Sequence, residues 1–497
     1  MAIQICRIKG DVVELVYHPK EADLRVGDTL LLQEKGGDRA LVVQIIEFRS
    51  VSSSSLLYDQ LRLALEDNPE TLLQLFTQFL KNPELEMRNL NIALAKIRKV
   101  ATLGWEGWDG WIPPRDVDIK FLSHAEVMHE CIPNFGNPLH LGETPHGEPF
   151  VIDGRALEKV NVIVGAKGSG KSYLAKVLLL ELIKQGAPCV VFDLNREYAQ
   201  LPGVRAFRAG MDLRLDLRQF GIDPFMTMLR RFGLPEVSAI HLEHRLRQLL
   251  GEMEEMEKAG RRAPFLGIRE LLQLAEAREF SDSEAVNAAI KSRLRAVWTT
   301  GLLAARPEEV VALEDVYQSI REGGALVLDI SGLSNIARSA FVQSMVEVLR
   351  RICEQEIRRR SERFPFVFFE EAHLYIPQNT IGYLVTRARH LGLTTFFITN
   401  MITGLDETIL RQVDNLFVLR IPFEDDVRYL GKTAILDEET LHAFVKRLKD
   451  YYALVVGNVT RGYPLIVRVK TLRGVETAGE TRYFFAKKII EPVPLPF

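Results

Sequence analysis

An apolar strand, a glycine-rich loop and a helix follow one another directly between residues 160 and 185. The segment Val160-Asn-Val-Ile-Val leads into the pattern G-x-x-x-x-G-K-S, which runs from Gly165 to Ser172, and helix-forming residues then continue to Gln185. Glycines let such a loop curl so that successive backbone amides point inward, and the N-terminus of the helix adds positive potential. The pattern therefore predicts a phosphate-binding loop, or P-loop.

The P-loop and the first turn of its helix form the predicted nucleotide site. ATP is expected to contact Gly165, Ala166, Lys167, Gly168, Ser169, Gly170, Lys171, Ser172 and Tyr173. In a loop of this type Lys171 reaches the β- and γ-phosphates, and the Ser172 hydroxyl is a ligand of Mg²⁺. The alternative, a glycine turn that binds no nucleotide, is disfavoured because a strand precedes the loop and a helix follows it. ATP and Mg²⁺ are the predicted cofactors.

A second apolar strand ends in two acidic residues. Phe366-Val-Phe-Phe is followed by Glu370, Glu371, Ala372 and His373. The Glu370 carboxylate is predicted to hold the water shell of Mg²⁺, and Glu371 is predicted to orient and activate the attacking water. Aspartate is usual at the first position, and the longer glutamate is compatible with a metal contact that runs through water. His373 is not expected to bind a metal, because no other His or Cys lies near it in the sequence.

Strand-like and helix-like segments alternate through most of the chain. The alternation begins near residue 150, gives way to charged helical sequence at about 224–322, and returns in strand-like segments at 325–330, 366–369, 394–399 and 415–421. This order predicts an α/β fold, in which a doubly wound parallel sheet is interrupted by a helical insertion.

The first 50 residues consist of short alternating runs separated by glycines, which predicts a small antiparallel β-barrel or sandwich. Apolar residues then recur at three- and four-residue spacing from residue 56 to about 98, which predicts two helices inserted in the barrel. Trp105, Trp108 and Trp111 follow in a glycine-rich segment. They form either a turn that packs on the barrel or an exposed aromatic patch for a partner or for bases.

These patterns divide the chain into five predicted parts. They are an N-terminal β-barrel with inserted helices at about 56–98 (1–135), the first part of the ATPase core (136–222), a helical insertion (223–322), the second part of the core (323–450), and a C-terminal strand pair with an extended arm (451–497).

Composition excludes several classes of protein. The chain has 497 residues, 47% of them hydrophobic and 26% charged, so it is neither a disordered chain nor a small disulfide scaffold. The 63 basic and 66 acidic residues give a net charge of -3, so nucleic-acid binding would need a local basic surface. The four cysteines form no C-x-x-C pair, and Cys189 is expected in the core. With no signal-peptide pattern and no apolar run of ~18 residues, we expect a cytoplasmic protein without membrane segments.

Several motifs together resemble the HerA branch of the HerA–FtsK ATPases. They are the P-loop, Asp193-Leu-Asn-Arg-Glu-Tyr, Val327-Leu-Asp-Ile-Ser-Gly-Leu, Phe368-Phe-Glu-Glu-Ala-His, Arg389-His-Leu-Gly, and Thr399-Asn400 with the stretch that runs to Asp414-Asn-Leu-Phe-Val-Leu-Arg. The flanks are similar too, with an N-terminal domain that resembles a HAS-barrel, a helical insertion after the second strand and a closing strand pair. The resemblance covers most of the chain and implies a RecA-like ATPase core.

This resemblance implies a homohexameric ring that hydrolyses ATP between subunits and drives double-stranded DNA through its pore as a translocase or helicase. Members of the family commonly work with a separate nuclease. In the family an arginine of the neighbouring subunit reaches the γ-phosphate; Arg389 matches that position best, followed by Arg387 and, more loosely, Arg411. The alternative for Arg389 is an ordinary arginine on a helix surface.

One motif departs from the family. Thr-Gln-Arg-Pro is usual after the fourth strand, whereas this chain has Thr399-Asn400-Met401-Ile402. Asn400 can still sense the γ-phosphate or hold the attacking water through its shorter amide. The missing Arg-Pro pair indicates a diverged branch, and two functions stay open. The ring is either a motor for DNA end processing or antiphage defence, or an ATP-gated scaffold whose N-terminal barrel docks an effector enzyme.

A local group of arginines is the candidate for DNA contact. Arg205, Arg208, Arg214 and Arg218 follow the second strand of the core. Six copies of this group would form a ring of positive charge around a pore.

Overall fold

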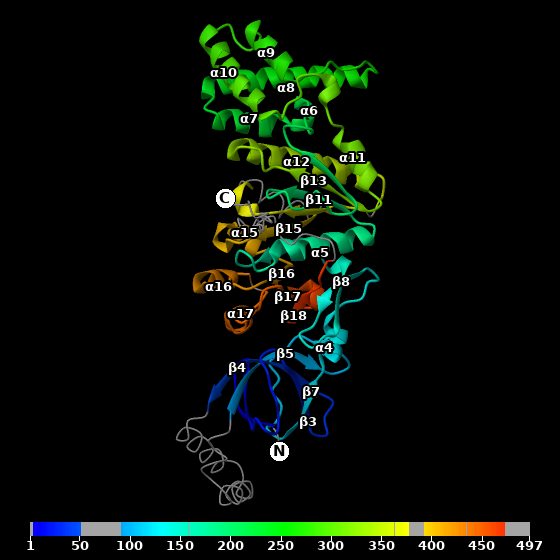
Figure 1. Cartoon of the computed structure of the whole chain (residues 1–497), viewed down its shortest axis with the longest axis vertical. Helices are drawn as coiled ribbons and strands as arrows, with labels where there is room; N and C mark the ends of the chain where they lie inside the picture. The colour runs from blue at the N-terminus through cyan, green and yellow to red at the C-terminus, as the bar shows by residue number, and fades with distance from the viewer. Residues whose placement is uncertain are drawn as a thin grey trace, which may run out of the picture.

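The computed structural model describes residues 3–50, 91–157, 159–361, 363–376, 392–433 and 435–472. In these ranges the chain is elongated, with an antiparallel sheet near the N-terminus, an α/β core in the middle and a group of helices at the far end (Figure 1). The far helices are inserted between two strands of the core, which places them opposite the N-terminal sheet. The predicted fold class, an α/β core with a largely parallel sheet, an N-terminal β-domain and a helical insertion, is confirmed.

Within the described residues, the N-terminal sheet has seven antiparallel strands and curls into a half-barrel (Figure 1). In spatial order the path is β1 (Ile3–Lys9), β2 (Val12–Tyr17), β5 (Asn91–Ala101), β4 (Ala40–Ser50), β3 (Thr29–Glu34) and β7 (Val117–Leu122), and the short β6 (Trp105–Glu106) pairs with β5. Val13, Leu15 and Tyr17 of β2 are buried, and the residues between them are less buried. This alternation is typical of a sheet with one face on a core.

The helices predicted from residue 56 to about 98 extend too far along the sequence. Residues 51–90 lie outside the described part of the chain, but residues 91–98 belong to strand β5. β5 pairs with β2 on one side and with β4 on the other, and its residues 93–97 are all buried. A strand buried on both faces is a continuous apolar run, which periodicity alone does not separate from a buried helix.

The tryptophan turn packs on the half-barrel. Trp108 and Trp111 are half-buried against its core, and the indole N–H of Trp108 donates a hydrogen bond to the Trp111 carbonyl (2.7 Å). The Arg39 guanidinium lies 5.1 Å from the centre of the Trp111 ring, and the Trp105 ring contacts Tyr463 of the α/β core. Of the two interpretations of this segment, the structure supports packing on the barrel.

In the part of the chain that the structure describes, eleven strands form the central sheet, and the first seven in spatial order are parallel. These seven are β12 (Val204–Arg208), β13 (Gly324–Asp329), β11 (Pro188–Asp193), β14 (Phe366–Phe369), β15 (Thr394–Thr399), β10 (Val160–Val164) and β16 (Asn415–Val418). The antiparallel strands β17 (Tyr452–Gly457), β18 (Leu465–Val469), β8 (Pro138–Glu143) and β9 (Pro149–Asp153) extend the sheet. Every residue of β10, β11, β13, β15 and β16 is buried, as expected for parallel strands covered on both faces.

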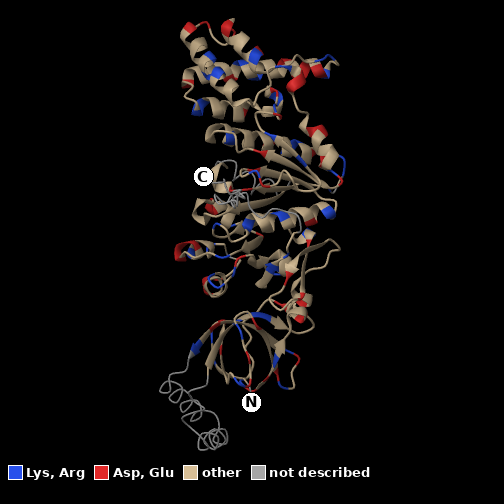
Figure 2. Cartoon of the chain, in the orientation of Figure 1, with Lys and Arg blue, Asp and Glu red and all other residues tan. Residues whose placement is uncertain are grey.

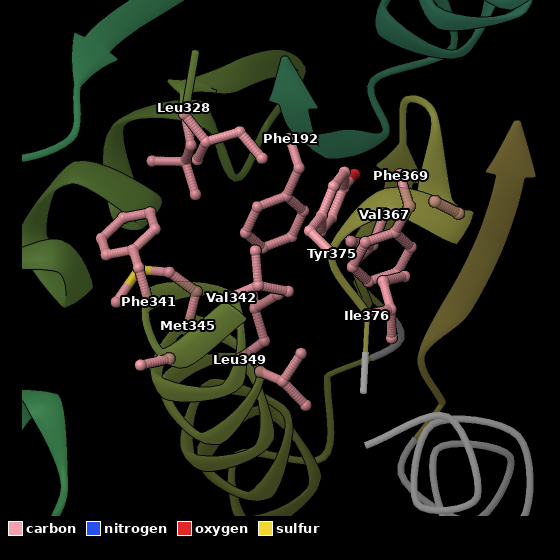
Figure 3. Packing of buried hydrophobic residues seen from close by; sticks show 14 of the residues in the cluster. Phe192, Leu328, Phe341, Val342, Met345, Leu349, Val367, Phe369, Tyr375 and Ile376 are labelled. Carbon is pink, nitrogen blue, oxygen red and sulfur yellow. The ribbon is translucent and has the colours of Figure 1, made fainter. Parts of the chain in front are cut away.

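Helices cover both faces of this sheet. Helix α5 (Lys171–Lys184) packs on one face and shares an apolar cluster with β11 and β15. Helix α12 (Asn335–Arg358) packs on the other face, where Val342 lies near Phe192 and Leu328 (Figure 3). The other helices of the core and its flanks are α4 (His124–Cys131), α15 (Glu407–Leu410), α16 (Glu424–Leu430) and α17 (Glu438–Val445), with 3-10 turns at Gly154–Leu157, Ala372–Leu374, Ile402–Gly404 and Asn458–Thr460.

The helical insertion lies between β12 and β13. It contains α6 (Leu217–Phe220), α7 (Ile222–Arg231), α8 (Glu236–Lys258), α9 (Ile268–Glu276), α10 (Glu284–Thr300), a 3-10 turn (Pro307–Glu309) and α11 (Leu313–Ile320). Phe225 and Met228 of α7 are buried in the same cluster as α12. The outer helices carry charges of both signs, many of them paired, as Arg247 is with Asp223 and Glu243 (Figure 2). An apolar interface therefore attaches the insertion, and mixed charge covers its outside.

Membrane-spanning helices and the cysteines were the subject of two expectations from composition. Among the described residues, no helix combines the length and the apolar character that crossing a bilayer demands. The four cysteines are not in disulfides, and Cys189 is buried in β11 as predicted.

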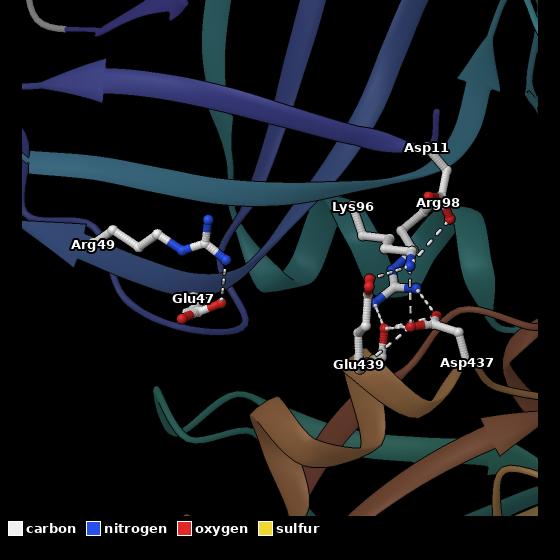
Figure 4. A network of polar contacts seen from close by, with 8 residues as sticks. Asp11, Glu47, Arg49, Lys96, Arg98, Asp437 and Glu439 are labelled. Carbon is white, nitrogen blue, oxygen red and sulfur yellow. Dashed lines mark hydrogen bonds and ion pairs between the residues drawn. The ribbon is translucent and has the colours of Figure 1, made fainter. Parts of the chain in front are cut away.

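Charged side chains join the half-barrel to the α/β core (Figure 4). Lys96 and Arg98 of β5 meet Asp437 and Glu439 at the start of α17. The Lys96 ammonium lies 2.7 Å from Glu439 and 3.2 Å from Asp437, and the Arg98 guanidinium lies 3.2 Å from Asp437. The side chains of Lys96 and Arg98 are only 7% and 8% exposed, so each cation depends on the carboxylates opposite it.

Several contacts of Asp437 favour its charged form. Its Oδ1 accepts the backbone N–H of Thr440 (2.9 Å), which caps α17, and its other oxygen pairs with Arg98. Burial opposes ionisation, but the Thr440 hydrogen bonds and the charges of Arg98 and Lys96 outweigh it and hold the pKa of Asp437 below its ordinary value.

Removing the Asp437 carboxylate is expected to destabilise the protein. Asp437→Ala leaves the buried Arg98 without its carboxylate and α17 without its cap; losing one partner of a buried pair costs about 3–5 kcal/mol, and the partial exposure of Asp437 places the loss near or below the lower limit. The measurement is the midpoint of thermal unfolding, with Glu439→Ala, whose side chain is 65% exposed, as the matched control.

The stability lost in Asp437→Ala should become smaller as the pH falls. Because the pKa of Asp437 is depressed in the folded protein, its stabilising contribution is present above the unfolded pKa of about 4 and is lost as the pH falls below it. The difference between Asp437→Ala and the unmodified protein should therefore narrow in acid. Equal unfolding midpoints for Asp437→Ala and Glu439→Ala at neutral pH would contradict this account.

Candidate nucleotide-binding site

The P-loop links β10 to α5 at the carboxyl edge of the parallel strands. Gly168 and Gly170 have φ values of 78° and 106°, in the left-handed region that favours glycine, and they turn the chain into the helix. The N–H of Ala166 donates to the Arg420 carbonyl (2.8 Å), and the Ser169 hydroxyl donates to the Ala166 carbonyl (2.7 Å). These contacts hold the loop curled, so that the predicted residues 165–173 surround the N-terminus of α5.

Lys171 and Ser172 are the first two residues of α5. Lys171 is buried, and its ammonium group donates to the Ala166 carbonyl across the loop (3.1 Å). The Ser172 hydroxyl donates to Oε1 of Glu370, directly after β14 (2.6 Å). The sheet brings these groups together because β10 and β14 are parallel and only β15 lies between them.

Glu370 is completely buried, and each of its oxygens accepts a hydrogen bond. Ser172 donates to one oxygen, and the Tyr198 hydroxyl donates to the other (2.7 Å). Burial raises the pKa of Glu370 to about 7, although these two hydrogen bonds act in the opposite direction.

The residues present fit a magnesium ion that is shared with a phosphate. A serine hydroxyl and a carboxylate supply the oxygen ligands that Mg²⁺ prefers, and a cation between them would compensate the buried negative charge of Glu370. In the part of the chain that the structure describes, no group of three or more His, Cys, Asp or Glu side chains could hold a metal by itself. A metal here would therefore be held by Ser172 and Glu370 together with the phosphates of a nucleotide.

The segment after β11 positions the tyrosine. The Asp193 carboxylate accepts the backbone N–H groups of Asn195 (3.1 Å), Glu197 (3.2 Å) and Tyr198 (3.0 Å), which folds the segment into a tight turn. Lys176 of α5 forms a buried ion pair with Glu197 (3.1 Å), which attaches the same turn to the helix of the P-loop. Tyr198 is thus a positioning residue that orients Glu370.

Glu371 has different surroundings from its neighbour. Its φ is 50°, in the left-handed region, which only a few residues other than glycine adopt. Its Oε2 atom is buried and accepts no hydrogen bond, and Nδ1 of His373 is 3.6 Å away. An unpartnered carboxylate oxygen beside a phosphate site is well placed to accept a proton from water.

His373 connects this carboxylate to the neighbouring strand. Its Nδ1 lies 2.9 Å from the Thr399 hydroxyl at the end of β15. Burial, helped by the nearby Lys171, lowers the pKa of His373 although Glu371 opposes the shift, so the imidazole is neutral at physiological pH. His373 therefore lies between Glu371 and Thr399, hydrogen-bonded to Thr399 and 3.6 Å from the Glu371 carboxylate.

Of the remaining predicted residues, Asn400 and Arg411 lie in the described part of the chain. Asn400 follows β15 directly and is exposed at the P-loop edge of the sheet. Arg389 and Arg387 lie outside the described residues, so their roles stay predictions. Arg411, the looser candidate, is exposed and pairs with Glu407 (3.0 Å).

The arginines predicted as a basic cluster mostly pair with carboxylates of the same chain. Arg208 pairs with Asp212, Arg214 with Glu309, and Arg218 with Asp216 and Glu257, while Arg205 is exposed on β12. Three of the four charges are thus compensated locally. This group offers less positive surface to DNA than the sequence pattern indicates.

Comparison with known proteins agrees with this geometry. The family description "Helicase HerA, central domain" matches residues 139–349, which include β10, the P-loop, the turn at Asp193 and most of α12. Residues 139–349 of this chain are therefore similar to the HerA central domain. The matched range ends before Glu370 and Glu371, so the roles of these two carboxylates rest on the contacts described above.

Two relatives are named DNA double-strand break repair helicase HerA. The protein of Sulfolobus acidocaldarius is 25% identical over 63% of this chain and 65% of its own length. The protein of Sulfurisphaera tokodaii is 24% identical over 64% of this chain and 66% of its own length. The chain thus covers slightly less than two thirds of these curated relatives.

A solved structure shows how far the fold is shared. VirB4 of Thermoanaerobacter pseudethanolicus superposes with a TM-score of 0.51 at 17% identity, over 69% of this chain and 99% of that chain. At this identity the likeness concerns the fold alone.

Two tyrosines beside the P-loop belong to the site although their contacts were not predicted. Tyr198 was visible as the last residue of the Asp-x-Asn-x-Glu-Tyr motif, but nothing in the motif indicates that its hydroxyl reaches Glu370. Tyr451 lies against Gly170, because β17 runs antiparallel to β16 and therefore begins at the P-loop edge of the sheet. No sequence signal marks Tyr451.

Neutralising Glu370 is expected to stabilise the nucleotide-free protein at alkaline pH. Glutamine in Glu370→Gln has the same shape and no charge to bury. Because the pKa of Glu370 is about 7 in the folded protein and lower when unfolded, the folded state retains a proton that the unfolded state loses, and stability falls as the pH rises toward 7. The unfolding midpoint of Glu370→Gln should therefore exceed that of the unmodified protein by more at about pH 8 than at about pH 5.

Thermal unfolding at the two pH values checks this, with Glu255→Gln on the exposed surface of α8 as the control. An equal gain at both pH values would show that burial does not keep Glu370 protonated.

Proposed function

We propose that the protein is a ring-forming ATPase that moves double-stranded DNA, as a translocase or helicase, and works with a separate nuclease or effector protein. The observation that carries the proposal is the contact of Ser172 and Tyr198 with Glu370, which joins the P-loop, the turn at Asp193 and the acidic end of β14 in one site. The HerA relatives, named as helicases of double-strand break repair, support the part that concerns DNA.

Each residue of the site has a place in hydrolysis. The amides of the P-loop and Lys171 bind the β- and γ-phosphates and compensate their charge. Ser172 and Glu370 would hold Mg²⁺, which when bound would neutralise charge on the phosphate oxygens. Glu371 accepts a proton from the attacking water at its unpartnered Oε2. Asn400 contacts the γ-phosphate or the water from the end of β15.

The reaction is proposed to take place between subunits of a homohexamer. Charge develops on the γ-phosphate in the transition state, and Arg389 of a neighbouring subunit compensates it. Two large apolar side chains beside the site support such an interface, since Leu374 is 52% and Met401 is 50% exposed. Exposed apolar side chains gathered beside a polar site are typical of surfaces that another protein covers.

The half-barrel is the proposed docking surface for the nuclease or effector, in DNA end processing or antiphage defence. Leu103 and Ile112, on either side of the tryptophan turn, are exposed while the turn itself packs on the sheet. This leaves apolar side chains available to a partner on a rigid support. The same surface serves the second candidate function, a scaffold gated by ATP that does not translocate DNA.

Steady-state ATPase activity with and without linear duplex DNA separates the two functions. A motor should be stimulated several-fold by DNA, and the stimulation should fall steeply with salt because phosphate contacts release counterions. Glu371→Gln provides the blank. Intact hydrolysis without any response to DNA would replace the motor with the scaffold.

Two substitutions test the assignment of the site. Lys171→Ala should abolish hydrolysis and weaken ATP binding, because a buried cation that faces the phosphates is lost. Glu371→Gln should bind ATP with unchanged affinity and lower kcat by about 10²–10⁴-fold, the usual contribution of a general base. ATP binding and kcat are measured for both, with Glu255→Gln as the control. Normal turnover in either site variant would contradict the assignment.

Mixed rings test the role of Arg389. Arg389→Ala subunits and Lys171→Ala subunits should each be inactive alone, and mixing them should restore part of the ATPase activity because some interfaces then combine two intact halves. Mixed rings that form and stay inactive would rule out Arg389 as the residue that acts on the neighbouring subunit.

A further inference from the structure

The strand order determines the direction in which a nucleotide lies. Glu370 and Glu371 follow β14, on one side of β10, so the γ-phosphate end of a nucleoside triphosphate faces that side. The base end then points to the other side of β10, where β16 and β17 follow. Val418, the last residue of β16, pairs with Val164 of β10 and with Leu454 of β17. The first residues of β17 are therefore at the same edge of the sheet as the P-loop.

Tyr451, directly before β17, is the aromatic residue at this place. Its N–H donates to the Ser169 carbonyl in the P-loop (3.0 Å), and its carbonyl accepts the N–H of Val469 (2.9 Å). Its ring meets the Tyr173 ring edge to face, with centroids 5.6 Å apart and planes at 83°. A Cβ atom at Gly170 would lie only 3.0 Å from Cδ1 of Tyr451. The ring is thus held against the P-loop and the first turn of α5.

The conformation of Tyr451 is strained, and its side chain is open to solvent. Its φ is 66°, in the left-handed region that a bulky residue rarely adopts, and 40% of the residue is exposed. The two backbone hydrogen bonds hold it there, and the adjacent Asp450 is fixed by an ion pair with Arg420 (3.0 Å). Arg420 in turn accepts the Ala166 N–H with its carbonyl, so the turn and the P-loop support each other. Strain of this kind persists at sites where the surrounding structure imposes it.

We infer that Tyr451 is the platform on which the base of the bound nucleotide stacks. The inference rests on the proposed nucleotide site and adds the binding place of the base, which the P-loop contacts leave unassigned. Stacking uses the π-face that every nucleobase has, so Tyr451 distinguishes a nucleotide from a bare triphosphate and favours the larger purines over pyrimidines. The phosphates are held at one side of Gly170 and the base at the other.

Binding of two probes to the purified full-length protein tests the inference. The probes are a non-hydrolysable ATP analogue and inorganic tripolyphosphate, both with Mg²⁺. Tyr451→Asn removes the ring while asparagine tolerates a positive φ, and Tyr451→Phe retains the ring without the hydroxyl. We expect Tyr451→Asn to lower the affinity for the ATP analogue by about 5- to 100-fold and to change the affinity for tripolyphosphate by less than about twofold. Tyr451→Phe should bind the analogue with the affinity of the unmodified protein.

Three other outcomes would overturn the inference, and they are distinguishable. An equal loss of affinity for both probes in Tyr451→Asn would mean that Tyr451 only supports the P-loop. Unchanged affinity for both probes would mean that the base lies elsewhere. Failure of the unmodified protein to bind either probe would overturn the proposed function itself, and the inference with it.

Discussion

Burying the Glu370 carboxylate is possible because two hydroxyl groups from distant parts of the chain reach it. Ser172 arrives from the start of α5, and Tyr198 arrives from the turn after β11. Both contacts require β10, β11 and β14 to run parallel, since only then do their carboxyl ends meet at one edge. The P-loop, the Asp193 turn and the unpartnered oxygen of Glu371 all take their places from that arrangement. The chemistry of the site therefore depends on strand direction as much as on the residues themselves.

The parts of the site that could be predicted are those with a local signal. The P-loop combines strand, glycines and helix within one short segment, and the acidic end of β14 follows an apolar run, so each is visible without knowledge of the fold. The contact of Tyr198 with Glu370 joins residues 172 positions apart, and the place of Tyr451 depends on an antiparallel strand at the end of the domain. Periodicity and motifs carry no information on such contacts, because strand order decides them.

The fold shows the same division. Alternating strands and helices and the inserted helical segment were predictable because each element has its own period and length. Strand β5 was not, since its residues 93–97 are all buried, and a strand without an exposed face loses the alternation that distinguishes it from a helix. The arginines near β12 show a related limit: their charges are visible in the sequence, but Asp212, Glu309 and Glu257, which compensate three of them, lie four to 95 residues away. Domain boundaries stay predictions, as do the roles of Arg387 and Arg389.

The hairpin of β17 and β18 links the site physically to the half-barrel. At its open end Tyr451 bonds to Ser169, and the N–H of Leu472 donates to the Tyr173 hydroxyl. At its closed end the hydroxyl of Tyr463 is 2.6 Å from that of Thr29, and Gln44 donates to the Pro464 carbonyl (3.0 Å). A shift of the P-loop relative to the half-barrel must therefore tilt the hairpin or break contacts at one end. Because the contacts at the closed end are buried and both strands of the hairpin pair with neighbours in the central sheet, either change would leave polar groups without partners, so the hairpin fixes the P-loop relative to the half-barrel.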